Sequence, residues 1–137
     1  MSASEKSVPK PTELDLEFYQ AITSSGNLHV ERCTKCNTYS HPPRYYCPNC
    51  FSPAREFAQV SGNGFIYSYT VSHFSVEPAW KAEIPYTTIV AELDEGPRLV
   101  GAGRGFDPTK IEIGSRVRVI PERISDDFAF LWVEPSE

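Results

Sequence analysis

All four cysteines of the chain lie in one short stretch, CTKCNTYSHPPRYYCPNC, which runs from Cys33 to Cys50. They form two C-x-x-C pairs, Cys33 with Cys36 and Cys47 with Cys50, separated by ten residues. Two residues between paired cysteines let one tight turn present both sulfurs to one ion, and a second such turn completes a tetrahedron. Because four protein ligands leave no open coordination position, we expect a structural zinc site and not a catalytic one.

Other chemistries compete for the same four thiols. A pair of disulfides requires an oxidising compartment, and nothing in the sequence indicates secretion. A thioredoxin-like redox pair places one C-x-x-C at the start of a helix, whereas these two pairs lie among prolines. Iron held by four thiolates stays open, and iron–sulfur clusters use four cysteines in other spacings. Zinc is the metal we predict, and a module of about 30 residues needs its binding free energy to fold.

Composition and charge limit the class of protein. The chain has 137 residues, a formal net charge of −5 and a pI of about 5.2. This acidic balance argues against a general nucleic-acid-binding protein, which neutralises phosphates with a basic face. No apolar run reaches the roughly 20 residues of a membrane span, and the polar opening MSASEKSVPKPTELD is unlike a signal peptide. We therefore expect a cytoplasmic protein with no membrane partner.

Hydrophobic spacing predicts one helix before the cysteine segment and five strands after it. Over residues 12–25, Leu14, Phe18 and Ile22 recur at four-residue spacing, which is typical of a short amphipathic helix. Alternating patterns predict the strands, which are in chain order 65–72, 86–93, a strand from Arg98 through Gly105, 116–120 and 128–133. Five short strands joined by turns favour a small β-barrel, although alternation alone does not separate a barrel from a sandwich.

Within the first of these strands the aromatic residues follow a period of two. Phe65, Tyr67 and Tyr69 alternate with Ile66 and small polar residues. Since successive side chains of a strand point to opposite faces, this spacing predicts one largely aromatic face.

The order of the motifs resembles one known family. After the helix come GNLHVERCTKC, HPPRYYCPNC, VSGNGFIYSYTV and PYTTIVAELDEGPRLVG, and FDPTKIEIGSRVRV precedes the last strand. This order resembles the DUF35 family, a rubredoxin-like zinc ribbon joined to an OB-fold barrel, over about residues 12–134. The resemblance implies a mainly β chain with a leader and N-terminal helix over 1–27, the zinc ribbon over 28–57 and a five-stranded OB-fold barrel over 58–137. The four cysteines match the family's metal positions, so zinc binding carries over to each of them.

The resemblance also implies a role. Family members look like non-catalytic partners of thiolase-fold enzymes in acyl-CoA chemistry: acetoacetyl-CoA and HMG-CoA formation, and thiolase or aldolase steps in steroid and aromatic degradation. The ribbon is expected to help hold coenzyme A and the barrel to contact the partner. The chain is then an accessory subunit of a hetero-oligomer that shares an acyl-CoA ligand. The residues themselves show no paired base and nucleophile and no phosphate-cradling glycine loop.

Basic and aromatic side chains of the cysteine segment are the candidates for coenzyme A contacts. Phosphates bind Arg or Lys, and adenine stacks on aromatic or guanidinium faces. The segment and its flanks have more basic than acidic residues: the four basic ones are Arg32, Lys35, Arg44 and Arg55, and the two acidic ones are Glu31 and Glu56. We predict the contacts at Arg32, Lys35, Arg44, Tyr45 and Tyr46. The alternative is that these side chains are solvated surface charges and that the tyrosines cover the turns that carry the cysteines. A basic patch on an OB-fold also suits single-stranded nucleic acid, which is the alternative function.

Two further stretches are candidates for contact with the partner. Aromatic anchors dominate binding hot spots, and the proline-bearing loop at 75–85 holds Trp80 close to Phe74. We predict partner contacts at Phe74, Trp80 and Arg104, with a loop folded back over the barrel mouth as the alternative. The stretch from Gly101 to Gly105 alternates small residues, which indicates either tight barrel curvature or a ligand channel.

Overall fold

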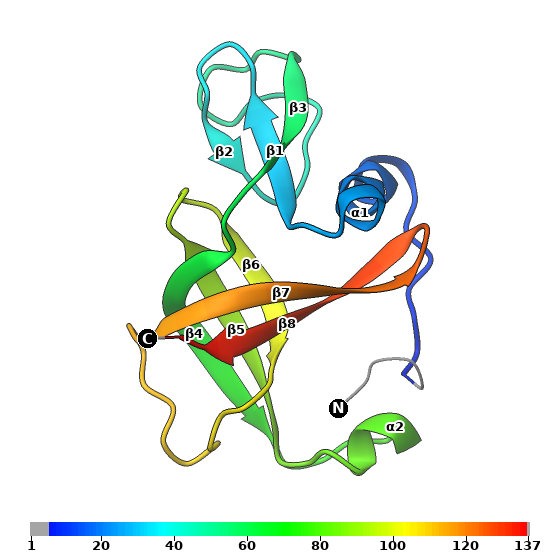
Figure 1. Ribbon diagram of the computed structural model, residues 1–137, viewed down its shortest axis with the longest axis vertical. Coiled ribbons are helices and arrows are strands. Elements are labelled where there is room, and N and C mark those ends of the chain that lie inside the picture. The colour runs from blue at the N-terminus through cyan, green and yellow to red at the C-terminus, as the bar shows by residue number, and fades with distance from the viewer. Residues whose placement is uncertain (1–5, 137) are drawn as a thin grey trace.

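The computed structural model describes residues 6–136 and shows a small ribbon above a barrel, with a helix beside their junction (Figure 1). The elements in chain order are α1 (Glu13–Ser25), β1 (His29–Cys33), β2 (Tyr39–Ser40), β3 (Arg55–Gln59), β4 (Asn63–Ser72), α2 (Pro78–Lys81), β5 (Tyr86–Leu93), β6 (Arg98–Gly103), β7 (Arg116–Ser125) and β8 (Phe128–Pro135). The predicted mainly β chain, with its N-terminal helix and five barrel strands, is confirmed. The described residues include no helix long and apolar enough to cross a membrane.

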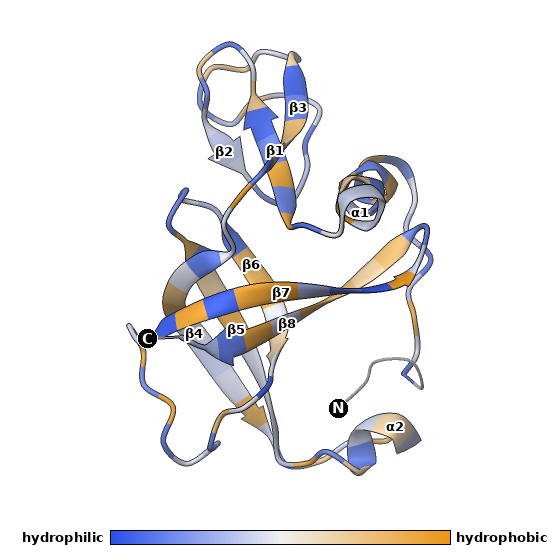
Figure 2. Cartoon of the chain, viewed as in Figure 1, coloured by the Kyte–Doolittle hydropathy of each residue, from blue (hydrophilic) through white to orange (hydrophobic). Residues whose placement is uncertain are grey.

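The five strands that follow the ribbon close into a barrel in the order β4-β5-β6-β8-β7. Strand β5 buries every second residue, and hydrophobic residues alternate with hydrophilic ones along the first half of β7 (Figure 2). This alternation places one set of side chains in the barrel interior, where Ile66, Ile89 and Val117 are fully buried. All neighbouring strands run antiparallel except β6 and β8, which are parallel.

Strand β4 does not keep its aromatic residues on one face, so that prediction was wrong. The pairing of β4 with β5 shifts register between Ile66 and Ser68, which leaves Tyr67 as an extra residue. Ile66 is fully buried and Tyr67 is 44% exposed, while Tyr69 packs against the core. One inserted residue reverses the face of everything after it. An uninterrupted period of two in the sequence gives no sign of such a bulge.

Helix α1 joins the ribbon to the barrel. Phe18 and Ile22, one turn apart, are buried at 2% and 1% exposure. The ring of Phe18 lies 6.4 Å from that of Phe57 in β3, and the ring of Tyr19 lies 4.7 Å from that of Phe128 in β8. Gly26 ends the helix in the left-handed region, at φ 78°, and its N–H donates to the carbonyl of Ile22 at 2.8 Å.

Gly101 marks a close approach of two strands. A Cβ atom at this position would lie 2.8 Å from the carbonyl oxygen of Leu131 and 2.8 Å from Cγ2 of Val133, both in β8. The glycine therefore lets β6 approach β8 where the barrel closes. This packing supports tight barrel curvature as the reason for small residues here.

We expect Gly101→Ala to lower the free energy of unfolding by about 1–3 kcal/mol, because the added methyl group must push β6 away from β8. Urea unfolding of the metal-loaded protein, followed by tryptophan fluorescence, measures the change. Val100→Ala is the matched control, since Val100 is 60% exposed, and should shift stability by no more than about 0.5 kcal/mol. A Gly101→Ala protein as stable as the wild type would contradict the packing.

Candidate metal centre

The four cysteine sulfurs converge on one point of the ribbon. Cys33 ends β1, Cys36 lies in the turn after it, and Cys47 and Cys50 lie in the loop that leads to β3. All four Sγ atoms lie within 4.8 Å of one another. The pairs Cys33–Cys50 and Cys36–Cys47 have sulfurs 3.6 Å apart. A tetrahedral ion with zinc–sulfur bonds of about 2.3 Å separates its sulfurs by about 3.8 Å, so the cluster fits zinc.

Each C-x-x-C pair sits in the same kind of backbone turn. In the first, the N–H of Asn37 donates to the carbonyl of Cys33; in the second, the N–H of Phe51 donates to the carbonyl of Cys47, both at 2.9 Å. Asn37 and Phe51 hold φ values of 65° and 63°. A left-handed residue directly after each second cysteine turns the chain sharply, which brings both sulfurs of the pair to one side.

The four cysteine sulfurs repel one another when they are ionised, unless a cation lies between them. The Thr38 hydroxyl, 3.1 Å from the Cys36 sulfur, and the side-chain amide of Asn49 lower the pKa of Cys36 to about 5. The backbone N–H of Ser52 lowers the pKa of Cys50, but burial and the neighbouring cysteines outweigh it and raise that pKa to about 11. A dication at the centre favours the thiolate form at every position, because a coordinating thiol loses its proton.

A buried carboxylate supports the centre from the side of β1. Glu31 is only 3% exposed, and its oxygens accept hydrogen bonds from the backbone N–H of Arg44 at 3.0 Å and from the Arg55 guanidinium at 3.1 Å. The same guanidinium reaches Glu17 of α1 at 2.8 Å. Arg55 therefore satisfies a buried charge and fastens the ribbon to the helix.

His41, the first residue of the H-P-P-R stretch, packs between the ribbon and α1. Its ring lies 4.8 Å from that of Phe18. Its Nδ1 atom is buried without a hydrogen-bond partner among residues 6–136. Burial lowers the pKa of His41 to about 4, since the charged ring would lose its solvation.

The structure separates the predicted coenzyme A residues into two groups. Arg32 is already engaged, because its guanidinium lies 2.9 Å from a carboxylate oxygen of Glu56. Lys35 and Arg44 are exposed, and neither forms an ion pair within the described part of the chain.

The two predicted tyrosines lie at the ribbon surface. Tyr45 and Tyr46 are 56% and 63% exposed. The Tyr45 hydroxyl donates to Glu13 of α1 at 3.2 Å. Both rings are therefore accessible to a ligand.

The predicted partner residues also differ in their surroundings. Phe74 is 77% exposed, as an anchor for a partner requires. Trp80 instead packs on Tyr86, with ring centroids 4.7 Å apart. Arg104 pairs with Glu134 at 2.7 Å and covers the ring of Trp132. Trp80 and Arg104 are therefore held by the barrel itself.

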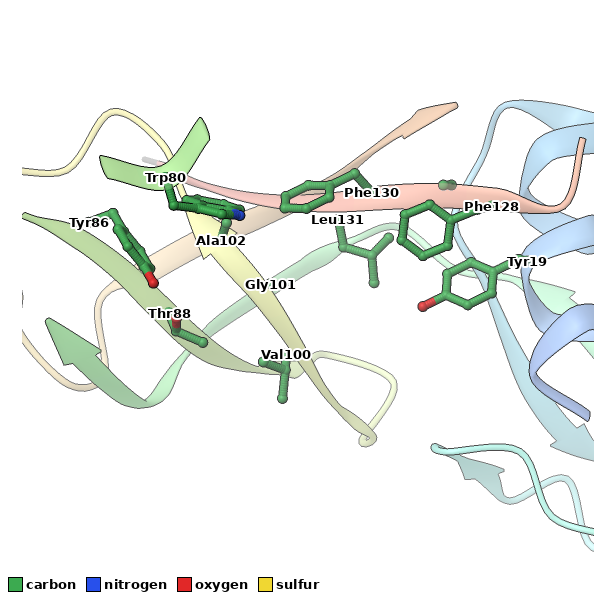
Figure 3. A pocket seen from close by; sticks show the side chains of 11 residues that line it. Tyr19, Trp80, Tyr86, Thr88, Val100, Gly101, Ala102, Phe128, Phe130 and Leu131 are labelled. Carbon is green, nitrogen blue, oxygen red and sulfur yellow. The ribbon is translucent and has the colours of Figure 1, made fainter. Parts of the chain in front are cut away.

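Sequence reasoning missed an aromatic pocket on the barrel. It is a cavity of about 330 Å³ between α1, α2, β5, β6 and β8 (Figure 3). Its rings come from positions far apart in the sequence, Tyr19, Trp80, Tyr86, Phe128 and Phe130. The sequence indicates only Trp80 as a candidate contact residue, because the other rings come close to it only in the folded chain.

Comparisons with known proteins assign the two halves of the chain. The model of the rubredoxin-like zinc ribbon domain of ChsH2 matches residues 23–56, and that of its C-terminal OB-fold domain matches residues 58–120. A DUF35 domain-containing scaffold protein of Methanothermobacter thermautotrophicus is 31% identical over 110 residues, which are 80% of this chain and 82% of the relative. The chain belongs to the DUF35 family. A second scaffold protein of that family, from Methanocaldococcus jannaschii, is 33% identical and spans 70% of this chain and 68% of its own length.

A longer relative and a solved structure add to this family assignment. A probable enoyl-CoA hydratase alpha subunit of Thermomonospora curvata is 39% identical over 80% of this DUF35 chain, which spans about a third (34%) of that relative. A solved structure described as "Ltp2-ChsH2(DUF35) aldolase" has 32% identity and a TM-score of 0.79, and the match covers 93% of this chain and 98% of that chain.

Replacing Cys47 by Ser should release the bound metal and unfold the ribbon, because three thiolates and a hydroxyl hold zinc poorly and the ribbon has little core of its own. The barrel should stay folded, because most residues of the shared hydrophobic core lie in its own strands. Elemental analysis and an amide NMR spectrum measure both effects. Lys35→Ala is the control, since Lys35 is exposed between two ligands, and should keep one zinc per chain. A Cys47→Ser protein that retains tightly bound zinc would show that the four-ligand assignment is wrong.

The His41 ring should stay neutral in the folded protein from pH 8 down to about 5.5, because its pKa is lowered to about 4. The unfolded chain takes up this proton near pH 6.5, so His41 contributes stability above that pH and loses it as the pH falls toward 4. An NMR titration of the metal-loaded protein reads the ring directly. Phe18→Ala, which opens the packing, should raise the midpoint, and a wild-type midpoint near 6.5 would contradict the buried ring.

Proposed function

We propose that this chain is a non-catalytic accessory subunit that binds a thiolase-fold enzyme and helps to hold its acyl-CoA substrate. The observation that carries the proposal is the match of nearly the whole chain to the structure described as Ltp2-ChsH2(DUF35) aldolase. Relatives named as scaffold proteins and as a hydratase alpha subunit support the same kind of role. An assembly of thiolase, aldolase or HMG-CoA synthase type is the proposed setting.

Cys33, Cys36, Cys47 and Cys50 hold one structural Zn²⁺ in this proposal. Sulfur separations of 3.6 Å and the match to a zinc ribbon domain support it. A zinc ion with four protein ligands has no position for water or substrate, so its contribution is to fold the ribbon. The ribbon then presents its loop to the ligand.

The loop between the two cysteine pairs is the proposed coenzyme A surface. Lys35 and Arg44 offer cations that no carboxylate of residues 6–136 neutralises, which suits phosphate oxygens. Tyr45 and Tyr46 offer exposed rings, which suit an adenine face. Arg32 contributes less than Lys35 or Arg44, because Glu56 already occupies its guanidinium.

Charge pairing weighs against the alternative of a single-stranded nucleic-acid module. Arg98, Arg104 and Arg116 of the barrel each lie within 3.0 Å of a carboxylate oxygen. Cations that are already paired contribute little to counterion release. The acidic net charge of −5 points the same way.

Pairwise co-expression with thiolase-fold enzymes of the same organism should yield a complex that elutes before either protein alone. Replacing both Lys35 and Arg44 by Ala should raise the KM for acyl-CoA on the order of ten-fold, because two charge-assisted contacts to phosphate are lost. Lys110→Ala, an exposed lysine of the barrel, is the control and should leave KM unchanged. Turnover of acyl-CoA by the isolated chain, or no complex with any thiolase-fold enzyme, would contradict the proposal.

A further inference from the structure

The barrel closes between β6 and β8 over a very short seam. These two strands pair only at Ala102 with Trp132 and at Gly103 with Val133. Before these pairs the strands diverge (Figure 3), and there β6 pairs with β5 alone and β8 with β7 alone. We call the wedge between residues 98–100 of β6 and residues 128–130 of β8 the open seam.

The unpaired backbone groups of β6 point into this open seam. The N–H of Leu93 donates to the carbonyl of Pro97 at 2.9 Å, which fixes the phase of the β5–β6 hairpin. Because antiparallel pairs alternate between bonded and non-bonded, Leu99 and Gly101 bond to β5 while Arg98 and Val100 face away from it. No residue of the described chain pairs with these outward groups of Arg98 and Val100.

Strand β8, on the opposite side of the open seam, also directs backbone groups into it. The carbonyl of Val133 accepts from the N–H of Arg104 at 2.9 Å, so Val133 faces β6. By the same alternation Ala129 faces the open seam, while Leu131, whose carbonyl oxygen lies next to Gly101, marks the end at which the two strands close. Backbone donors and acceptors therefore line both walls.

The side chains that border the open seam are apolar. The aromatic pocket of about 330 Å³ lies along it and includes Tyr19, Phe128 and Val100 in its walls (Figure 3). Val100 is 60% exposed. Proteins usually protect a free strand edge with charges, proline or a bulge. Arg98 is occupied by Glu92 at 3.0 Å, which leaves Val100 as an unprotected edge position.

We propose that the open seam binds one extended peptide segment of the partner enzyme, which adds a strand to β6 at Val100 and places an apolar side chain in the aromatic pocket. The inference rests on the proposed function, which supplies the partner. An extended peptide satisfies the free N–H and C=O groups and fills the pocket at the same time. An aliphatic ligand would fill the pocket and leave these backbone groups unpaired, at a cost in free energy.

The size of the open seam also favours a single segment. Only two residues of β6 present free backbone groups, and the cavity measures about 330 Å³. A stable complex between folded faces buries roughly 1,200–2,000 Å². The open seam alone therefore does not support a dimer of this chain, but it accommodates one arm within a larger interface.

Val100→Pro tests the added strand, because it removes an N–H that points away from β5 and leaves the β5–β6 bonds in place. Its affinity for the thiolase-fold enzyme found by co-expression should fall at least ten-fold in calorimetry. Val100→Thr keeps the N–H and a β-branched side chain, and should bind within three-fold of the wild type. Zinc content and circular dichroism confirm that both variants fold. A correctly folded Val100→Pro protein that binds like the wild type would overturn the inference.

Single-residue hydrogen exchange on the wild-type complex gives a second test that needs no variant. Binding should slow exchange of the Val100 amide at least ten-fold, while Leu99 and Gly101, already bonded to β5, should change less than two-fold. An unchanged Val100 amide in a stable complex would overturn the strand and leave the proposed function intact. Failure of the wild-type chain to bind any such enzyme would contradict both. A dimer of the chain alone that depends on Val100 would show that a second copy occupies the open seam. This result would also overturn the inference that a partner peptide binds there.

Discussion

The ribbon depends on four sulfur atoms that lie close enough to share one ion. The ribbon has three short strands, one of only two residues, and so little apolar surface that it has no core comparable to that of the barrel. Thiols held 3.6 Å apart repel one another once ionised. A single dication would remove that repulsion and join the two turns that carry the cysteine pairs. Metal binding and ribbon folding are then coupled in one equilibrium.

The fold transmits this constraint from the metal to the barrel. Cys33 ends the strand that carries Glu31, and Arg55 links Glu31 to Glu17 on α1. Phe18, on the same helix, packs against His41 of the ribbon, while Tyr19 packs against Phe128 of the barrel. The metal thus fixes the ribbon loop at one end of the molecule, and α1 fixes the ribbon relative to the aromatic pocket. This arrangement suits an adaptor that contacts a ligand and a partner at separate places.

Local patterns predicted the parts that depend on local geometry. The C-x-x-C spacing predicted the sulfur cluster, and the four-residue spacing of Phe18 and Ile22 predicted α1 and its buried face. The bulge in β4 escaped because Tyr67 continues the alternation in the sequence while it interrupts the pairing in space.

Features that require long-range contacts were not predictable. The engagement of Arg32 by Glu56 depends on the pairing of β1 with β3. The aromatic pocket forms only because α1, α2 and β8 meet in the fold. The open seam can be found only when it is known which barrel strands pair and over how many residues.

X-ray absorption of the purified, reduced protein tests the central claim most directly. We predict one zinc per chain with four sulfur neighbours at about 2.3 Å, and nitrogen or oxygen neighbours, or a folded ribbon without metal, would contradict it.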